Sequence, residues 1–199
     1  MILIGASGHA KVILDILEQN GQDIECLIDA NPNIKMLCGY VVEHDSTFDF
    51  TGKDAILSIG SNTIRKKLAL TLPCNFETAI HPKSILDSTV KVLEGTVIMA
   101  GVVINRDTAV GKHVIVNTSA SIDHDCVIND FVHISPNVTL CGAVHVGEGA
   151  HIGAGAVVIP NIKIGKWAVI GAGAVVINHI PDFAVVVGNP GKIIKYTNG

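Results

Sequence analysis

The chain of 199 residues carries 14 Lys and Arg against 18 Asp and Glu, a formal net charge of −4 at pH 7, and its length allows one or two domains. This balance provides no basic surface, so neither nucleic acid nor an anionic membrane is expected as a partner. The chain is 48% hydrophobic but only 4% aromatic. No apolar run reaches the ~20 residues of a membrane span, and the N-terminus lacks the basic segment of a signal peptide. The five cysteines form no Cys-x-x-Cys pair, which favours reduced thiols in a cytoplasmic protein.

The first part of the chain alternates between short apolar segments and helical patterns. In order, we predict a strand at 1–4, a helix at 10–20 that ends at Gly21, a strand at 24–28 and a strand at 55–59. A second helix begins at Ser61 or Asn62 and ends before Pro73. Alternation of this kind predicts a small parallel sheet of the Rossmann type, with ligands bound at the carboxyl edge of its strands.

A glycine-containing turn, residues 5–9 (Gly-Ala-Ser-Gly-His), follows the first strand. The turn leads into a predicted helix, and the free backbone N–H groups at a helix N-terminus form a natural phosphate site. Asp29 lies 24 residues beyond Gly5, near the position of a ribose-binding acid in dinucleotide folds. However, the turn reads G-x-x-G-x-A and departs from the dinucleotide pattern G-x-G-x-x-G. We therefore favour a nucleotide diphosphate without nicotinamide, and a tight turn that binds nothing is the alternative.

An aliphatic residue recurs at every sixth position through the rest of the chain. Seventeen such positions follow one another without a slip from Ile80 to Val176. Two residues before each lies a small or branched residue, and both are expected to point inward. The inward residues of this second set are Thr96, Val102, Thr108, Val114, Ala120, Cys126, Val132, Val138, Val144, Ala150 and Ala156. A period of six is typical of a hexapeptide β-helix, in which three hexads form one coil of 18 residues. The tail from Val185 leaves the hexad phase, and we expect it to run back along the coils.

Four histidines lie close together on this repeat: His124, His133, His145 and His151. His133 and His151 are 18 residues apart and are predicted to stack. One coil beyond His124 lies Gly142, which is expected to leave open space beside the imidazole. A zinc site of the γ-carbonic anhydrase type requires two histidines five residues apart, and no pair here has that spacing. A general base is the stronger interpretation, since an imidazole can take a proton from an amine or hydroxyl nucleophile near neutral pH. Asp125 follows His124 directly, but adjacent strand residues point in opposite directions, so their contact requires a bend or a second subunit.

The chain resembles the hexapeptide-repeat sugar acetyltransferases of the sialic acid O-acetyltransferase family. The resemblance rests on residues 5–17 (GASGHAKVILDIL), 58–68 (SIGSNTIRKKL), 117–161 and 188–192 (GNPGK). It is strongest to the branch that N-acetylates nucleotide-linked 4-amino-sugars of the bacillosamine or perosamine type. The fold implied is an α/β Rossmann-like N-terminal domain, residues 1–78, followed by a left-handed parallel β-helix of hexapeptide repeats with a C-terminal tail, residues 79–199.

The same resemblance implies roles for individual residues. His124 matches the catalytic base and Asp125 the acid that supports it, although the bacillosamine-pathway member has Glu at that position. Four residues match positions that contact acetyl-CoA: His133, Gly142, Ala154 and Ala172. Six match the nucleotide-sugar pocket: Ser7, Gly8, His9, Asp29, Ala30 and Gly60. The family also implies a homotrimer with active sites between subunits, acetyl-CoA as co-substrate and no metal.

The sequence thus predicts an acetyl-CoA-dependent N-acetyltransferase that acts on the amino group of a nucleotide-activated amino-sugar by direct transfer. Three alternatives remain open at this stage. The first is O-acetylation of a sialic acid or related sugar, the second a non-catalytic scaffold, and the third a zinc-dependent hydratase.

Overall fold

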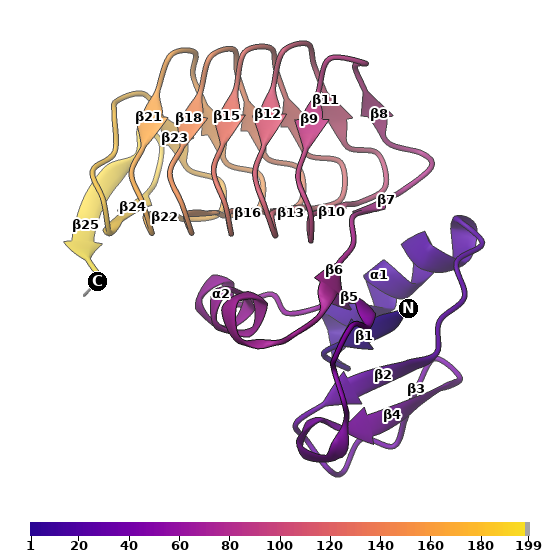
Figure 1. The fold of residues 1–199 in the computed structure, drawn as a ribbon. Helices are drawn as coiled ribbons and strands as arrows, with labels where there is room; N and C mark the ends of the chain where they lie inside the picture. Colours follow the sequence, from indigo (N-terminus) through magenta and orange to yellow (C-terminus); the bar gives the residue numbers. More distant parts are fainter. Residues whose placement is uncertain (198–199) are drawn as a thin grey trace.

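The structure is a computed structural model that describes residues 1–197. Figure 1 shows a small α/β part at the N-terminus that lies beside the first coils of a long prism. Asn198 and Gly199, the last two residues of the predicted second domain, lie outside the described residues. No helix in residues 1–197 is long and apolar enough to span a membrane.

The N-terminal sheet has six strands in the order β3-β4-β2-β1-β5-β6. All neighbours are parallel except the β3–β4 hairpin. The strands are β1 (Ile2–Ile4), β2 (Cys26–Asp29), β3 (Met36–Leu37), β4 (Tyr40–His44), β5 (Asp54–Leu57) and β6 (Asn75–Phe76). The helices are α1 (Gly8–Gln19), α2 (Asn62–Thr71) and the 3-10 helix η1 (Asp45–Thr47).

The predicted strands and helices of this part are present, and the prediction missed β3, β4 and β6. Strands β3 and β6 have two residues each and form the two ends of the sheet, and β4 lies next to β3. Met36 and Val41 are 61% and 57% exposed. Strands of this kind leave no clear alternation of apolar and polar residues for a sequence pattern to detect. The ends of β1 and β5 lie together as expected, since the Ser58 hydroxyl donates to the Gly5 carbonyl at 2.6 Å.

The prism is a parallel β-helix of 17 two-residue strands, β7 to β23, that recur every six residues. The first sheet faces the N-terminal domain and contains β7 (Ala79–Ile80), β10 (Val97–Ile98), β13 (Ile115–Val116), β16 (His133–Ile134), β19 (His151–Ile152) and β22 (Val169–Ile170). The second contains β8 (Ile85–Leu86), β11 (Val103–Ile104), β14 (Ser121–Ile122), β17 (Thr139–Leu140), β20 (Val157–Val158) and β23 (Val175–Val176). The third contains β9 (Lys91–Val92), β12 (Ala109–Val110), β15 (Val127–Ile128), β18 (His145–Val146) and β21 (Lys163–Ile164). Paired strands are offset by 18 residues, as in His133 with His151, so each three hexads form one coil.

Both inward-pointing sets of the hexad are buried from Thr96 onward, as predicted, whereas Ile80, Leu86 and Val92 in the first coil are partly buried. The second set, from Thr96 to Ala156, is at most 1% exposed. Each two-residue strand is followed by a four-residue corner, and one residue of that corner has positive φ in every hexad from Gly95 to Gly173. Non-glycine residues at this position, such as Asp125 with φ of 58°, adopt the left-handed conformation because the coils on both sides hold the backbone there. The fold class predicted from the sequence is therefore confirmed: a Rossmann-like α/β sheet followed by a parallel β-helix of hexapeptide repeats.

The C-terminal tail differs from its prediction. We expected it to run back along the coils. Instead, β24 (Ala184–Val187) pairs parallel with β22 and continues the first sheet. Then β25 (Lys192–Tyr196) turns back and pairs antiparallel with β24. Ala184 and Val186 still point into the apolar core, so the same inward pattern that builds the coils directs this strand into the next rung.

Apolar contacts join the N-terminal domain to the first coils. Ala79, Val97 and Ile115, which point outward from the first sheet, share a buried cluster with side chains of β1 and α1. The N-terminal domain therefore covers β7, β10 and β13 of the first sheet (Figure 1). The next strand, β16, reaches the carboxyl edge of the N-terminal sheet, where His133 Nδ1 lies 3.4 Å from the Gly60 carbonyl.

Candidate active site

His124 and Asp125 form a hydrogen-bonded pair at the corner between β14 and β15. His124 Nδ1 lies 2.8 Å from Asp125 Oδ2, and both side chains are exposed. The left-handed backbone of Asp125 turns its carboxylate toward the preceding ring, and this conformation recurs at every hexad corner. The repeat itself thus supplies the bend that the sequence left open, and the pair forms within one chain.

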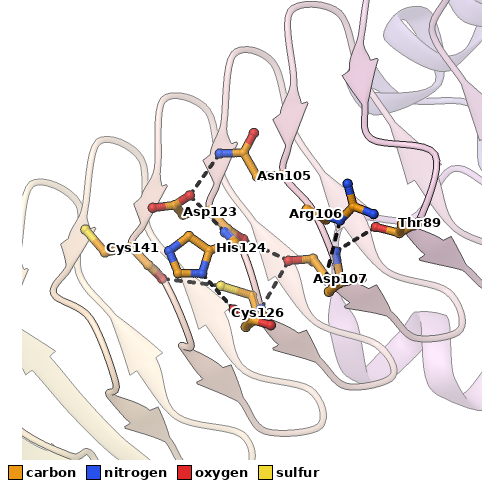
Figure 2. Close-up of polar contacts among 10 residues, drawn as sticks. Thr89, Asn105, Arg106, Asp107, Asp123, His124, Cys126 and Cys141 are labelled. Carbon is orange, nitrogen blue, oxygen red and sulfur yellow. Dashed lines mark hydrogen bonds and ion pairs between the residues drawn. The ribbon is translucent and has the colours of Figure 1, made fainter.

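The coil before this corner holds the His124 loop in place (Figure 2). Asp123 Oδ1 accepts from the His124 backbone N–H at 2.9 Å and from Asn105 Nδ2 at 2.9 Å. The buried Thr108 hydroxyl donates to the Asp123 carbonyl at 2.8 Å and accepts from the Cys126 N–H at 3.1 Å. Both ends of the loop are therefore fixed by side chains that lie 15 to 18 residues earlier in the chain.

The electrostatics of this corner favour a basic imidazole. The hydrogen bond to Asp125 raises the pKa of His124, and the negative charge of Asp123 adds to that increase. Hydrogen bonds from Asn105 and from the backbone lower the pKa of Asp123, so this carboxylate stays ionised. A carboxylate only accepts, so Nδ1 of the neutral ring carries the proton and Nε2 presents its lone pair.

Gly142 lies directly against this imidazole. A Cβ built on Gly142 would lie 2.7 Å from Cε1 and 2.8 Å from Nε2 of His124. The sequence suggested open space beside His124, whereas the structure shows that the ring itself occupies that space. A cavity of about 330 Å³ adjoins the other side of the ring, and its lining includes Asp87, Arg106 and Asp123.

A second cluster of histidines lies where the N-terminal domain meets the first sheet. The rings of His133 and His151 stack with centroids 4.7 Å apart and planes 2° apart, as the 18-residue spacing predicted. The His9 ring lies 6.2 Å from His133. His133 Nδ1 approaches the Gly60 carbonyl at 3.4 Å, and Ser135 Oγ lies 2.9 Å from His151 Nε2.

These three imidazoles are neutral at physiological pH. Burial lowers the pKa of His9 to about 4 and that of His133 to about 3. The neighbouring His151 and Arg65 lower the pKa of His133 further, and burial also lowers the pKa of His151. His9 Nε2 is buried without a hydrogen-bond partner in the described residues. The cluster therefore offers uncharged donors and acceptors.

The nucleotide-pocket residues predicted from the sequence converge at the carboxyl edge of the N-terminal sheet. Ser7 and Gly8 are exposed at the start of α1, and Gly60 is exposed just after β5. Asp29 has a structural task that the sequence did not reveal: Oδ2 accepts from the Ala6 N–H at 2.7 Å and Oδ1 from the Asn31 N–H at 2.8 Å. The carbonyl of Ala30 lies 3.1 Å from His44 Nε2, which links this edge to the end of β4.

Ala154 and Ala172 are exposed on the corner that follows the first sheet, one coil apart. The strands that carry His133 and His151 run directly into the same edge of the prism. His124 and Gly142 lie on a different edge, after the second sheet. The structure therefore brings the predicted residues together in two groups on two edges of the prism.

Sequence reasoning missed Asn105, Asp123 and Thr108 as supports of the His124 loop. Asn105 and Asp123 are 18 residues apart, so the coil length was the signal that could have found this pair. Sequence reasoning also missed Arg65, whose contacts depend on how the N-terminal domain packs on the prism. In residues 1–197, no group of three or more His, Cys, Asp and Glu side chains is arranged to hold a metal ion.

Comparison with protein families identifies both parts of the chain. Residues 1–72 match the PglD N-terminal domain, and residues 143–178 match the bacterial transferase hexapeptide model of six repeats. No curated protein sequence matches the chain significantly. The fold and these two matches define a hexapeptide-repeat transferase.

Solved structures extend the match over almost the whole chain. A variant of perosamine N-acetyltransferase from Caulobacter crescentus, in complex with CoA and GDP-perosamine, is 34% identical with a TM-score of 0.92, over 98% of this chain and 96% of that one. The acetyltransferase domain of PglB from Neisseria gonorrhoeae, in complex with acetyl coenzyme A, is 32% identical with a TM-score of 0.88, over 97% and 98%. The protein WeeI from Acinetobacter baumannii is 26% identical with a TM-score of 0.88. The chain belongs to the hexapeptide-repeat acetyltransferase family that includes the perosamine and PglB enzymes.

Proposed function

We propose that this protein transfers the acetyl group of acetyl-CoA to the amino group of a nucleotide-activated amino-sugar. The observation that carries the proposal is the His124–Asp125 pair, with its 2.8 Å hydrogen bond, on an exposed corner of a hexapeptide prism. Such a pair suits deprotonation of an amine, and the relatives were solved with CoA, acetyl coenzyme A or GDP-perosamine.

In the proposed mechanism His124 is the general base. The sugar amine attacks the thioester carbonyl, and Nε2 takes the proton that the amine loses as the C–N bond forms. The tetrahedral intermediate then breaks its C–S bond, and the imidazolium returns the proton to the leaving thiolate. Asp125 keeps Nδ1 protonated and stabilises the transient imidazolium. The products are an N-acetylated sugar and free CoA, with no covalent enzyme intermediate.

The two substrates are assigned to two different sets of residues. Ser7, Gly8 and His9 at the start of α1 suit the phosphates of the nucleotide-sugar, and the unpartnered Nε2 of His9 offers a hydrogen bond to it. Asp29, Ala30 and Gly60 complete this pocket. We assign acetyl-CoA to His133, Gly142, Ala154 and Ala172, with the neutral His133 beside the acetyl group.

The site is proposed to form between two subunits of a homotrimer. His124 lies on the edge after the second sheet, whereas His133 belongs to the first sheet and the nucleotide pocket lies beside it. A neighbouring copy that packs edge to edge brings its own His124 to the His133 of this chain. The same arrangement accounts for Gly142 and Ala154, which lie on different edges of one chain but contact one co-substrate in the proposal.

A thiol-release assay tests the activity. Acetyl-CoA is mixed with enzyme and with UDP-, GDP- and CMP-linked amino-sugars, each against the corresponding hydroxy-sugar, and with free sialic acid. Release that requires the amino group supports N-acetylation, and release with sialic acid alone supports the O-acetyltransferase alternative. The variant His124→Ala should lower kcat by roughly 10²–10⁴ while the circular dichroism spectrum stays unchanged, and near-normal turnover would refute the role of His124.

Mixed oligomers test the shared site. His124→Ala and His9→Ala chains, each inactive alone, are coexpressed with different affinity tags and purified through both tags. If each site combines His124 from one chain with His9 from another, every mixed trimer purified through both tags holds one intact site, so about one third of the sites are restored. A mixed oligomer with no activity above the separate variants contradicts an intersubunit site.

A further inference from the structure

Arg65, on the inner face of α2, is the charged side chain most deeply buried in the described chain, at 1% exposed. Its guanidinium crosses the junction between the two parts of the molecule. Nε donates to the His113 carbonyl at 2.8 Å and Nη2 to the Phe131 carbonyl at 2.8 Å, both on the β-helix. Nη1 donates to the Ile59 carbonyl at 3.0 Å, in the loop before α2.

Asn62 extends this contact by one coil. Its Nδ2 donates to the Gly149 carbonyl at 2.9 Å, and its Oδ1 accepts from Arg65 Nη2 at 3.0 Å. His113, Phe131 and Gly149 follow one another at 18-residue steps, so they occupy the same corner of three successive coils. The start of α2 is therefore bonded to three rungs of the prism at once.

The Arg65 contacts favour a particular geometry more than they favour stability. In residues 1–197 every hydrogen-bond partner of the guanidinium is a neutral oxygen. Burial lowers the pKa of Arg65 to about 9, which shows how unfavourable the site is for a charge. A buried charge without a carboxylate partner adds little net stability. However, the N–H groups of the planar guanidinium point in fixed directions, so all of them find acceptors only when the two parts of the molecule are aligned in one way.

The rest of the domain junction lacks this directionality. Ala79, Val97 and Ile115 pack against β1 and α1 through apolar surface. The free energy of apolar burial depends on the area that is covered and has no preferred direction, so it does not fix how the two surfaces are aligned. The apolar contact therefore accounts for the association of the two parts, and the Arg65 hydrogen bonds account for their alignment.

The aligned loop is the wall of the proposed nucleotide-sugar pocket. The Gly60 carbonyl lies 3.4 Å from Arg65 Nη1 and 3.4 Å from His133 Nδ1. Residues 60–63 also line a cavity of about 820 Å³ together with His151 and Trp167 of the β-helix. We infer that Arg65, with Asn62, is a positioning residue that sets the nucleotide-sugar pocket in register with the acetyl-transfer face of the β-helix. The kinetic effects expected from this inference rest on the proposed function.

Steady-state kinetics with both substrates varied separately test the inference. Arg65→Lys keeps the positive charge but cannot make the separate hydrogen bonds of Nε, Nη1 and Nη2. KM for the nucleotide amino-sugar should therefore rise roughly 10- to 100-fold. KM for acetyl-CoA should stay within about twofold, because only His133 among its proposed contacts lies near Arg65, whereas Gly142, Ala154 and Ala172 lie on other corners of the prism. Lys67→Gln, on the exposed face of the same helix, is the matched control and should behave as wild type. A merely structural role would lower Vmax for both substrates and leave both KM values unchanged.

Trp167 provides a readout that needs no activity, because it is the only tryptophan and lines the same cavity as residues 60–63. Acrylamide quenching of its fluorescence should increase in Arg65→Lys and, to a smaller degree, in Asn62→Ala. Both variants are compared with Lys67→Gln, and the circular dichroism spectra of all three must agree to show that each variant is folded. If the wild type transfers no acetyl group, the proposed function fails, and the quenching still decides the alignment. Wild-type KM and wild-type quenching in Asn62→Ala, or in a folded Arg65→Lys, would overturn the inference.

Discussion

Gly142 offers a direct test of the contact between neighbouring coils at the proposed base. In Gly142→Ala the new Cβ would lie 2.7 Å from Cε1 and 2.8 Å from Nε2 of His124. Carbon atoms in contact prefer about 3.5–4.0 Å, so the ring must move by roughly 1 Å. The displaced ring also loses its alignment with Asp125, which holds Nδ1 at 2.8 Å.

The magnitude follows from this displacement. A misplacement of about 1 Å at a reacting group lowers the rate by roughly 10²-fold, so kcat/KM of Gly142→Ala should fall by about that factor. The fold should persist, because the exposed His124 ring can turn toward solvent. The thiol-release assay measures kcat/KM, and thermal unfolding measures the stability.

Two controls separate this effect from general damage to the β-helix. Gly101→Ala introduces a Cβ at another hexad corner, where the Ser119 hydroxyl at 3.0 Å is the nearest atom and can rotate away. Gly101 has positive φ, so this variant should lose about 1 kcal/mol of stability and keep its activity. The double variant Gly142→Ala with His124→Ala should be no slower than His124→Ala alone. A folded Gly142→Ala enzyme with wild-type kcat/KM, or a double variant with additive losses, would refute the reasoning.

Three further predictions follow from the same geometry. Asp125→Asn removes the carboxylate that raises the pKa of His124, so the acidic limb of the kcat/KM profile should move to lower pH, and an unmoved limb would count against this partner. His9 and His133 are held neutral in the folded state by pKa values of about 4 and about 3, below the ordinary 6.5. Since the unfolded chain binds these protons below 6.5 and the folded chain does not, stability should fall by roughly 1 kcal/mol per histidine from about pH 7.5 to about pH 5.5. Chemical denaturation at both pH values measures this fall, and His133→Asn should reduce it; an equal fall in that variant would argue against the assignment. Thr108→Val removes the buried hydroxyl that joins both ends of the His124 loop, and should lower the free energy of unfolding by about 1–3 kcal/mol; an unchanged denaturation midpoint would show that this hydroxyl does not support the loop.

The sequence alone determined the β-helix and much of its internal order. A period of six fixes which side chains point inward, and 18 residues per coil fixes which side chains stack. For that reason the buried sets from Thr96 to Ala156 and the stacked rings of His133 and His151 were predictable. These relations are periodic and local, so the spacing of residues along the chain is sufficient to find them.

Only the tertiary structure decided how the His124–Asp125 pair forms and how the two parts of the molecule align. The contact with Asp125 depends on a left-handed corner that the neighbouring coils impose on a non-glycine residue. The contacts of Arg65 depend on the orientation of one domain on another, and no repeat in the sequence encodes that orientation. Hydrogen bonds require particular distances and angles between groups far apart in the chain, so they become visible only when the packing is known.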